Sequence, residues 1–161
     1  MLTGSDRLAA RGRVLADQFE RARGGLSGRP VHVLLVEDHR LVRHVMARAL
    51  RGAGLVVIEA ETAQRAREVL DGVHVDAAVL DVSLPGEMNG VQLGHWMRYR
   101  DPQLPMVFVT GLTDWEMRDA IPDDPLTRFL RKPFGARVIV DLVSSLLSPR
   151  HGIGGFQTAN D

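Results

Sequence analysis

A chain of 161 residues, of which 45% are hydrophobic and 25% charged, has the composition of a globular protein with one well-buried domain. Its 20 basic and 20 acidic side chains cancel, so we expect neither nucleic acid nor a membrane surface as a partner. The absence of cysteine excludes disulfides, thiolate nucleophiles and cysteine-based zinc sites. The chain shows no signal-peptide pattern and no apolar run of membrane-spanning length, which predicts a cytoplasmic protein.

Residues 1–29 are predicted to be an N-terminal extension that is partly helical. Apolar residues at helical spacing could line one narrow face of a helix from Asp6 to Ala22, which Gly24 and Gly25 would end. Six arginines against three acidic residues leave this extension with a charge of about +3. Both a docking or coiled-coil role and a loosely docked segment remain open for it.

From Pro30 onward, apolar runs of strand length alternate with segments whose apolar residues recur at helical spacing. The runs predict five strands, at residues 31–36, 55–60, 77–81, 105–109 and 127–131. The segments between and after them predict helices at residues 41–50, 63–70, 91–100, 114–121 and 135–147. Pro122 and Pro125 end the fourth helix early, so we expect it to be short.

This alternation predicts an α/β domain over residues 30–148. Its expected architecture is a flavodoxin-like doubly wound (βα)5 fold, with a five-stranded parallel sheet in the order 2-1-3-4-5. Residues 149–161, which are rich in glycine and polar residues, are predicted to be a flexible C-terminal tail. In such a sheet the crevice lies beside strands 1 and 3, at their carboxyl ends.

Polar side chains follow four of the five predicted strands. Glu37 and Asp38 follow the first strand, and Asp81 ends the third. Thr110 follows the fourth strand, and Lys132, the single lysine of the chain, follows the fifth. Each residue alone is explained as a cap, a turn residue or a solvated charge. Because the carboxyl ends of parallel strands share one edge, we expect three carboxylates, a hydroxyl and an ammonium group to converge there.

Three clustered carboxylates repel one another and would take up protons unless a cation lay between them. Oxygen ligands without cysteine or a histidine pair indicate a hard divalent ion, in the first place Mg²⁺, which keeps coordination positions free for phosphate oxygens. With Lys132 as a second positive charge, the cluster is typical of a phosphoryl-transfer site with an aspartate as nucleophile. Thr110 could donate a hydrogen bond to a phosphoryl oxygen.

Four motifs in this order resemble the receiver domain of bacterial two-component response regulators. They are Leu35-Val36-Glu37-Asp38, Leu80-Asp81-Val82-Ser83-Leu84-Pro85-Gly86 with Gly90, Val109-Thr110-Gly111, and Arg131-Lys132-Pro133-Phe134. The resemblance covers roughly residues 30–148. Each motif is weak alone, whereas their order and spacing together are specific. The form of the family that the chain resembles is the single-domain type, as in chemotaxis and phosphorelay receivers.

The resemblance implies a role for each acidic residue of the cluster. Asp81 would be the phosphoacceptor, and Asp38 and Asp81 would bind Mg²⁺ directly. Glu37 would bind the ion directly or through water, and the backbone carbonyl of Ser83 would complete the ligands that the protein supplies.

The resemblance also implies which residues respond to the phosphoryl group. Lys132 would pair with it, and the bond between Lys132 and Pro133 is expected to be cis. Thr110 would sense the phosphoryl group, and Phe129 takes the position of the family's switch aromatic. The short fourth helix and the Pro-Asp-Asp-Pro sequence at residues 122–125 depart from the family pattern. Which surface reports phosphorylation is therefore open.

The implied function is a receiver that takes a phosphoryl group on Asp81 from a sensor histidine kinase or a histidine phosphotransfer protein and then switches its contacts with a downstream protein. The roughly 13 residues after Ser148 are too few for a DNA-binding domain, so we expect no output domain in the chain. It would be no enzyme beyond its own Mg²⁺-dependent phosphorylation and dephosphorylation. The identity of the downstream protein and the formation of a homodimer are open.

Two alternatives share the fold and most of the motifs: a degenerate receiver that binds proteins independently of phosphorylation, and the receiver portion of a hybrid kinase. An FMN-binding flavodoxin is disfavoured, because Glu37 and Asp38 would repel the FMN phosphate. A phosphatase of the haloacid dehalogenase type would need a second aspartate where Ser83 stands.

Overall fold

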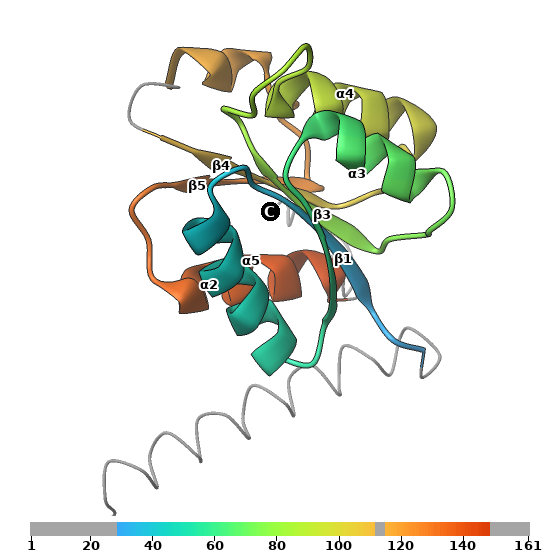
Figure 1. Ribbon diagram of the computed structural model, residues 1–161, viewed down its shortest axis with the longest axis vertical. Coiled ribbons are helices and arrows are strands. Elements are labelled where there is room, and N and C mark those ends of the chain that lie inside the picture. The colour runs from blue at the N-terminus through green and yellow to red at the C-terminus, as the bar shows by residue number, and fades with distance from the viewer. Residues whose placement is uncertain (1–28, 112–114, 149–161) are drawn as a thin grey trace, which may run out of the picture.

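The computed structural model describes residues 29–111 and 115–148. Five parallel strands form one sheet in the order β2-β1-β3-β4-β5 (Figure 1). This confirms the predicted fold and strand order, and every predicted strand end lies within one residue of the observed end. The strands are β1 (His32–Val36), β2 (Val56–Ala60), β3 (Ala77–Asp81), β4 (Met106–Thr110) and β5 (Thr127–Arg131).

Helices cover both faces of the sheet and give it two apolar clusters (Figure 1). On one face, α2 (Arg40–Gly52) and α5 (Ala136–Leu147) bury side chains such as Met46, Leu50 and Ile139. On the other, α3 (Ala63–Leu70) and α4 (Gly90–Arg100) pack against the sheet, with Leu93 and Met97 fully buried or nearly so. Because both faces are covered, every residue of β3 and β4 is buried. None of the described helices is long and apolar enough to cross a membrane.

The connection from β4 to β5 contains a 3₁₀-helix, η1 (Trp115–Ala120), where the sequence predicts a short helix over residues 114–121. Ile121 follows η1 and is buried in the cluster with α3 and α4. Pro122 comes next and ends the helical segment. The helix predicted over residues 6–22 and the tail predicted over residues 149–161 lie outside the described residues.

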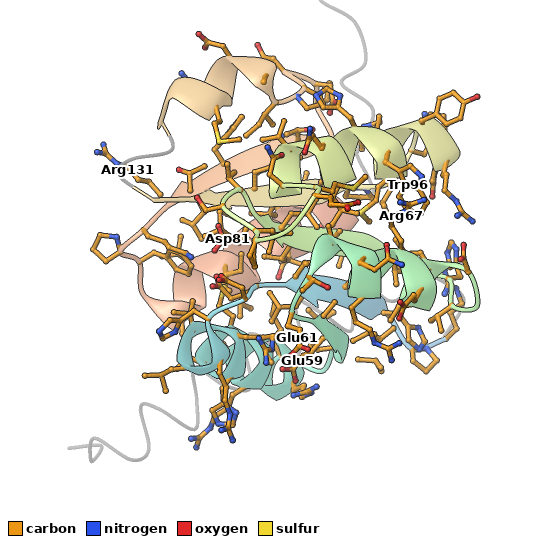
Figure 2. The ribbon with its side chains drawn as sticks, turned by 45° about the horizontal axis from the view of Figure 1, so that its top comes forward. Glu59, Glu61, Arg67, Asp81, Trp96 and Arg131 are labelled. Carbon is orange, nitrogen blue, oxygen red and sulfur yellow. The ribbon has the colours of Figure 1, made fainter. Side chains whose placement is uncertain are left out.

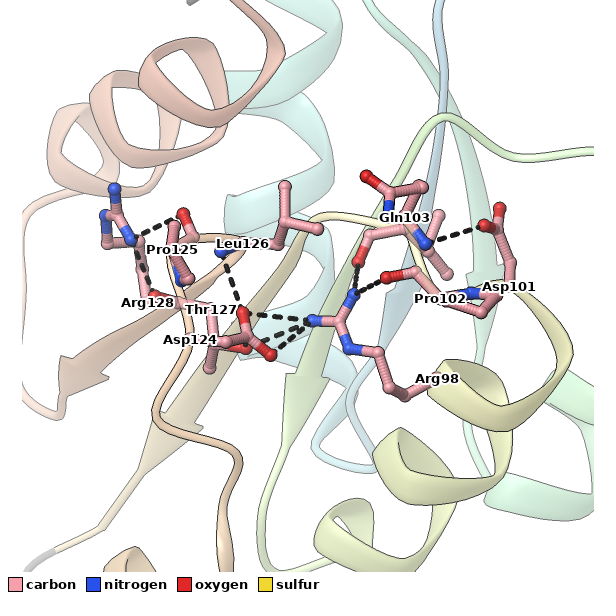
Figure 3. Close-up of polar contacts among 10 residues, drawn as sticks. Arg98, Asp101, Pro102, Gln103, Asp124, Pro125, Leu126, Thr127 and Arg128 are labelled. Carbon is pink, nitrogen blue, oxygen red and sulfur yellow. Dashed lines mark hydrogen bonds and ion pairs between the residues drawn. The ribbon is translucent and has the colours of Figure 1, made fainter. Parts of the chain in front are cut away.

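An arginine of α4 holds the turn that precedes β5 (Figure 3). Arg98 Nη2 lies 3.3 Å from Asp124 Oδ2 and donates to Thr127 Oγ1 at 3.1 Å. The Thr127 hydroxyl donates in turn to Asp124 Oδ1 at 3.0 Å. Arg98 Nη1 donates to the carbonyls of Pro102 and Leu104, at 3.2 and 2.5 Å. These bonds tie α4, the loop before β4 and the start of β5 together at the amino edge of the sheet.

The first residue of α4 lies directly against the end of β3. The Gly90 amide donates to the carbonyl of Val82 at 3.0 Å, and a Cβ built on Gly90 would lie 1.7 Å from the carbonyl oxygen of Asp81. Asn89 caps the helix through a capping box with Gln92. The backbone amide of Gln92 donates to Asn89 Oδ1 at 2.9 Å. Only glycine leaves room for this close approach of two backbones.

We therefore expect Gly90→Ala to lower the free energy of unfolding by about 2 kcal/mol, since backbone rather than a flexible side chain must give way. Gly52→Ala is the matched control: it has no neighbour within 4 Å, and it should leave stability unchanged or raise it by up to about 1 kcal/mol. Urea denaturation of both variants measures the difference. Equal stability of the two would show that the end of β3 can move aside.

Candidate functional site

The pairing of β1 with β3 brings three carboxylates together at the carboxyl edge of the sheet, where Figure 2 labels Asp81. Val36 pairs with Leu80, so Glu37 and Asp38 emerge beside Asp81. One carboxylate oxygen from each of the three lies within 4.8 Å of the others. Glu37 and Asp81 are buried, with 0% and 4% of their surface exposed, whereas Asp38 is exposed. The three acidic residues that the sequence singles out are thus one cluster.

Lys132 reaches this cluster from the end of β5. Its amide donates to the carbonyl of Thr110 at 2.8 Å, and its bond to Pro133 is cis, as the resemblance implied. The ammonium group donates to Glu37 Oε2 at 2.9 Å and to Asp81 Oδ2 at 2.6 Å. One lysine therefore bridges the two buried carboxylates.

Backbone amides hold the remaining oxygens of the two buried carboxylates. The Ser83 amide donates to Asp81 Oδ1 at 2.9 Å, and the His39 amide donates to Glu37 Oε1 at 3.1 Å. Both carboxylates are consequently fixed in orientation. The observed contact of Ser83 with Asp81 is made by its backbone amide, and the predicted role of its carbonyl as a Mg²⁺ ligand stays a prediction.

The electrostatic balance of the cluster leaves it short of positive charge. Burial raises the pKa of the Glu37 carboxyl above its ordinary value, the hydrogen bond from Lys132 opposes that rise, and the charge of Asp81 adds to it. For Lys132, burial acts to lower the pKa, but the hydrogen bonds with Asp81 and Glu37 outweigh it, so the pKa of the ammonium group lies above its ordinary value. The cluster thus holds one ammonium charge against three carboxylates and favours a further cation.

The two predicted switch residues lie at different depths. Thr110 ends β4 at the rim of the site and is only 3% exposed. Phe129 lies two residues before the end of β5 and is half-buried, with its ring centroid 6.3 Å from that of Phe108. The guanidinium of Arg118, from η1, covers the Phe129 ring at 5.4 Å. Phe129 thus lies between Phe108 in the core and Arg118 of η1.

Arg43, which the sequence does not single out, also belongs to the site. Its Nη1 donates to the backbone carbonyl of Glu37 at 2.7 Å and to that of Asp38 at 3.3 Å. The sequence has 19 arginines, and only the position of Arg43, about one helical turn after Glu37 and Asp38, could have indicated that it lies at the site.

The sequence profile of the response regulator receiver domain matches residues 33–144, and the chain belongs to this family of two-component signalling domains. The chain is similar to the sensor kinase CckA of Brucella abortus, with 36% identity over 117 residues that make up 71% of this chain and 12% of the kinase. It is 28% identical over 123 residues to the transcriptional regulatory protein PhoP of Escherichia coli, covering 76% of this chain and 55% of PhoP.

Solved structures agree with this assignment. A response regulator receiver protein from Sinorhizobium medicae superposes with a TM-score of 0.67 at 26% identity, covering 73% of this chain and 94% of that one. The receiver domain of NtrX from Brucella abortus gives a TM-score of 0.66 at 26% identity, covering 71% and 97%. The chain thus spans nearly all of these receivers but only 12% and 55% of the two curated relatives named above.

The donor set fits the Mg²⁺ that the family implies. Asp38, Asp81 and Glu37 supply carboxylate oxygens within one ion's reach of one another, and hard oxygen donors are the ligands that Mg²⁺ prefers. Burial and the charge of Asp81 raise the pKa of the Glu37 carboxyl, and a cation beside it would stabilise its deprotonated form.

This balance predicts a link between pH, stability and Mg²⁺. Because the folded-state pKa of Glu37 is raised, its protonated form favours the fold, and the metal-free free energy of unfolding should fall as pH rises from about 4.5 to the folded pKa. The slope is at most about 1.4 kcal/mol per pH unit for one proton. Mg²⁺ should offset the loss, since it binds the deprotonated form.

Glu37→Gln should flatten this pH dependence and reduce the stabilisation by Mg²⁺, whereas Glu87→Gln, the same change at an exposed position, should behave as the unaltered protein. Urea unfolding between pH 4 and 8, with and without Mg²⁺, provides the measurement. A Glu37→Gln protein that keeps the full Mg²⁺ response would place the ion elsewhere.

Proposed function

We propose that Asp81 accepts a phosphoryl group from the phosphohistidine of a sensor histidine kinase or a histidine phosphotransfer protein, in a Mg²⁺-dependent reaction. The observation that carries the proposal is the position of the Asp81 carboxylate, 2.6 Å from the Lys132 ammonium and within 4.8 Å of oxygens of Glu37 and Asp38. Membership of the receiver family supports the same assignment.

The chemistry combines the groups of this edge with a bound Mg²⁺ and the phosphohistidine of the donor. A carboxylate oxygen of Asp81 attacks phosphorus as the bond from phosphorus to the donor imidazole breaks, which yields an acyl phosphate. The ring nitrogen keeps the bonding electron pair and leaves as neutral histidine, because the other ring nitrogen carries a proton. Lys132 then pairs with a phosphoryl oxygen in place of the Asp81 carboxylate. Bound Mg²⁺ supplies positive charge to the transferring oxygens.

The proposed output is a change in the contacts of the phosphorylated domain with another protein, in the cytoplasm. We expect no turnover beyond the chain's own phosphorylation and the hydrolysis of its acyl phosphate. The relatives include a sensor kinase and a transcriptional regulatory protein, both longer than this chain. The partner of this receiver could therefore be a separate protein or another part of the same one.

Asp81→Asn should abolish phosphorylation, because an amide oxygen is too weak a nucleophile. Incubation with Mg²⁺ and either acetyl phosphate or a phosphorylated kinase should give hydroxylamine-labile phosphate on the unaltered chain. Asp119→Asn, the same change at an exposed position, should still be labelled, and chelation of the metal should remove labelling throughout.

Hydroxylamine-labile phosphate on the Asp81→Asn protein would refute the assignment. So would its absence from the unaltered chain with Mg²⁺ and several donors. In that case binding partners that do not distinguish Asp81→Asn from the unaltered protein would support a receiver that works without phosphorylation.

We further propose that Thr110 and Phe129 transmit the change. The Thr110 hydroxyl would move toward a phosphoryl oxygen and take its loop along, vacating space under β4. Phe129, which is half-buried under the Arg118 guanidinium, would then turn further into the core. Two packings that differ by a few kcal/mol suffice for such a shift.

Beryllofluoride with Mg²⁺, which mimics the phosphoryl group, should shift the ring resonances of Phe129, while those of the fully buried Phe108 change less. Thr110→Val should remove the Phe129 shift without preventing beryllofluoride binding, because the hydroxyl is absent and the side-chain volume is kept. Phe129 resonances that stay still while those of the Thr110 loop move would make the ring a static part of the core.

A further inference from the structure

Arg43 makes contacts that reach from the acidic pair to the neighbouring strand. Its Nη1 donates to the carbonyls of Glu37 and Asp38, while its Nε lies 3.5 Å from Glu59 Oε2 and its Nη2 lies 3.8 Å from Glu61 Oε2. Figure 2 labels Glu59 and Glu61 beside α2. Only 15% of the Arg43 side chain is exposed, so the guanidinium lies between the loop and β2.

The two carbonyls that Arg43 binds precede the backbone hydrogen bonds of α2. The first bond of the helix runs from the Arg43 amide to the carbonyl of His39, at 2.9 Å. The carbonyls of Glu37 and Asp38 lie two residues and one residue before it, respectively. The Arg43 side chain reaches back to both, and a planar guanidinium can do so in one fixed geometry.

The orientation of these peptide planes decides where the acidic side chains point. Glu37 has a second restraint, because the His39 amide donates to its Oε1 at 3.1 Å. Asp38 is exposed, so its direction depends on the backbone that carries it. A guanidinium bound to both carbonyls therefore restrains the two residues as a pair.

We propose that Arg43 is a positioning residue that sets the direction of the Glu37 and Asp38 carboxylates for Mg²⁺, and that Glu59 holds the Arg43 guanidinium in place. The inference rests on the proposed function, because it assumes that these carboxylates bind the ion. Outer residues that orient metal ligands typically change metal affinity by about 10- to 100-fold.

The charge of Arg43 affects Mg²⁺ affinity in the direction opposite to its positioning role. As a positive charge near the site, the guanidinium repels a cation. If charge alone mattered, removing it would tighten Mg²⁺ binding. If positioning dominates, as proposed, removing it weakens binding.

Arg51 provides a matched control on the same helix. Its Nη2 lies 2.8 Å from Glu59 Oε1 and donates to the carbonyl of Val57 at 3.0 Å, so it shares the Glu59 partner, and both contacts lie on β2. Arg43→Gln and Arg51→Gln remove the same charge. Arg43→Lys keeps the charge but replaces the planar fork by one ammonium group.

The experiment is a Mg²⁺ titration of the full chain, followed by backbone amide resonances, with the His39 amide as a local reporter. We expect Arg43→Gln to raise the dissociation constant about tenfold and to shift the His39 amide before metal is added. The dissociation constant of Arg43→Lys should fall between those of Arg43→Gln and the unaltered chain. Glu59→Gln should weaken Mg²⁺ binding less than Arg43→Gln does. The dissociation constant of Arg51→Gln should stay within about twofold of that of the unaltered chain.

Unchanged or tighter binding in Arg43→Gln would overturn the inference, as would an equal loss in Arg51→Gln. Urea unfolding without metal shows whether Arg43→Gln folds; if it does not, Arg43→Lys and Glu59→Gln decide by the same criterion. Failure of the proposed function gives a different result, since the unaltered chain would then show no Mg²⁺-dependent shifts around Asp38 and Asp81.

Discussion

The bridge that Lys132 forms between two buried carboxylates is the interaction on which the site depends. Glu37, Asp81 and Lys132 come from the ends of β1, β3 and β5, so three strands must be in register before the charges can meet. Without Lys132 the two buried carboxylates would lack a compensating charge, and an uncompensated buried charge destabilises a fold. Misplacing any of the three strands would cause the same destabilisation, so the charges make the strand order specific at this edge.

The bridge does not neutralise the cluster, and the remaining negative charge is what the proposed chemistry uses. One ammonium against three carboxylates leaves the edge favourable to a cation, and a cation makes the edge favourable to a phosphoryl group. Each added charge thus prepares the site for a charge of opposite sign. The rest of β3 offers no charged or polar side chain as an alternative partner, since Ala77, Ala78, Val79 and Leu80 are apolar and buried.

Sequence reasoning reached the acidic cluster because strand ends and parallel topology obey strong rules. Continuous apolar runs located the strands, and the order 2-1-3-4-5 brought Glu37, Asp38 and Asp81 to one edge. Lys132 stood out because it is the single lysine. Arg43 and Arg98 did not, because their importance lies in how far a guanidinium reaches across the fold, which composition and spacing do not reveal. The 3₁₀ form of η1 was also beyond prediction, since proline indicates where a helix ends but not how tightly it winds.

The bonds of Arg98 hold the start of β5 to α4 through Asp124 and Thr127, at the edge of the sheet opposite to the acidic cluster. Phe129 lies two residues further along β5, where the Arg118 guanidinium covers its ring. If Thr110 and Phe129 transmit the phosphoryl signal as proposed, the anchored start of β5 stays fixed while the surroundings of Phe129 change. A protein that distinguishes the two states would then have to contact the surface around Arg118 and Phe129, whereas a protein bound at the Arg98 anchor would not distinguish them.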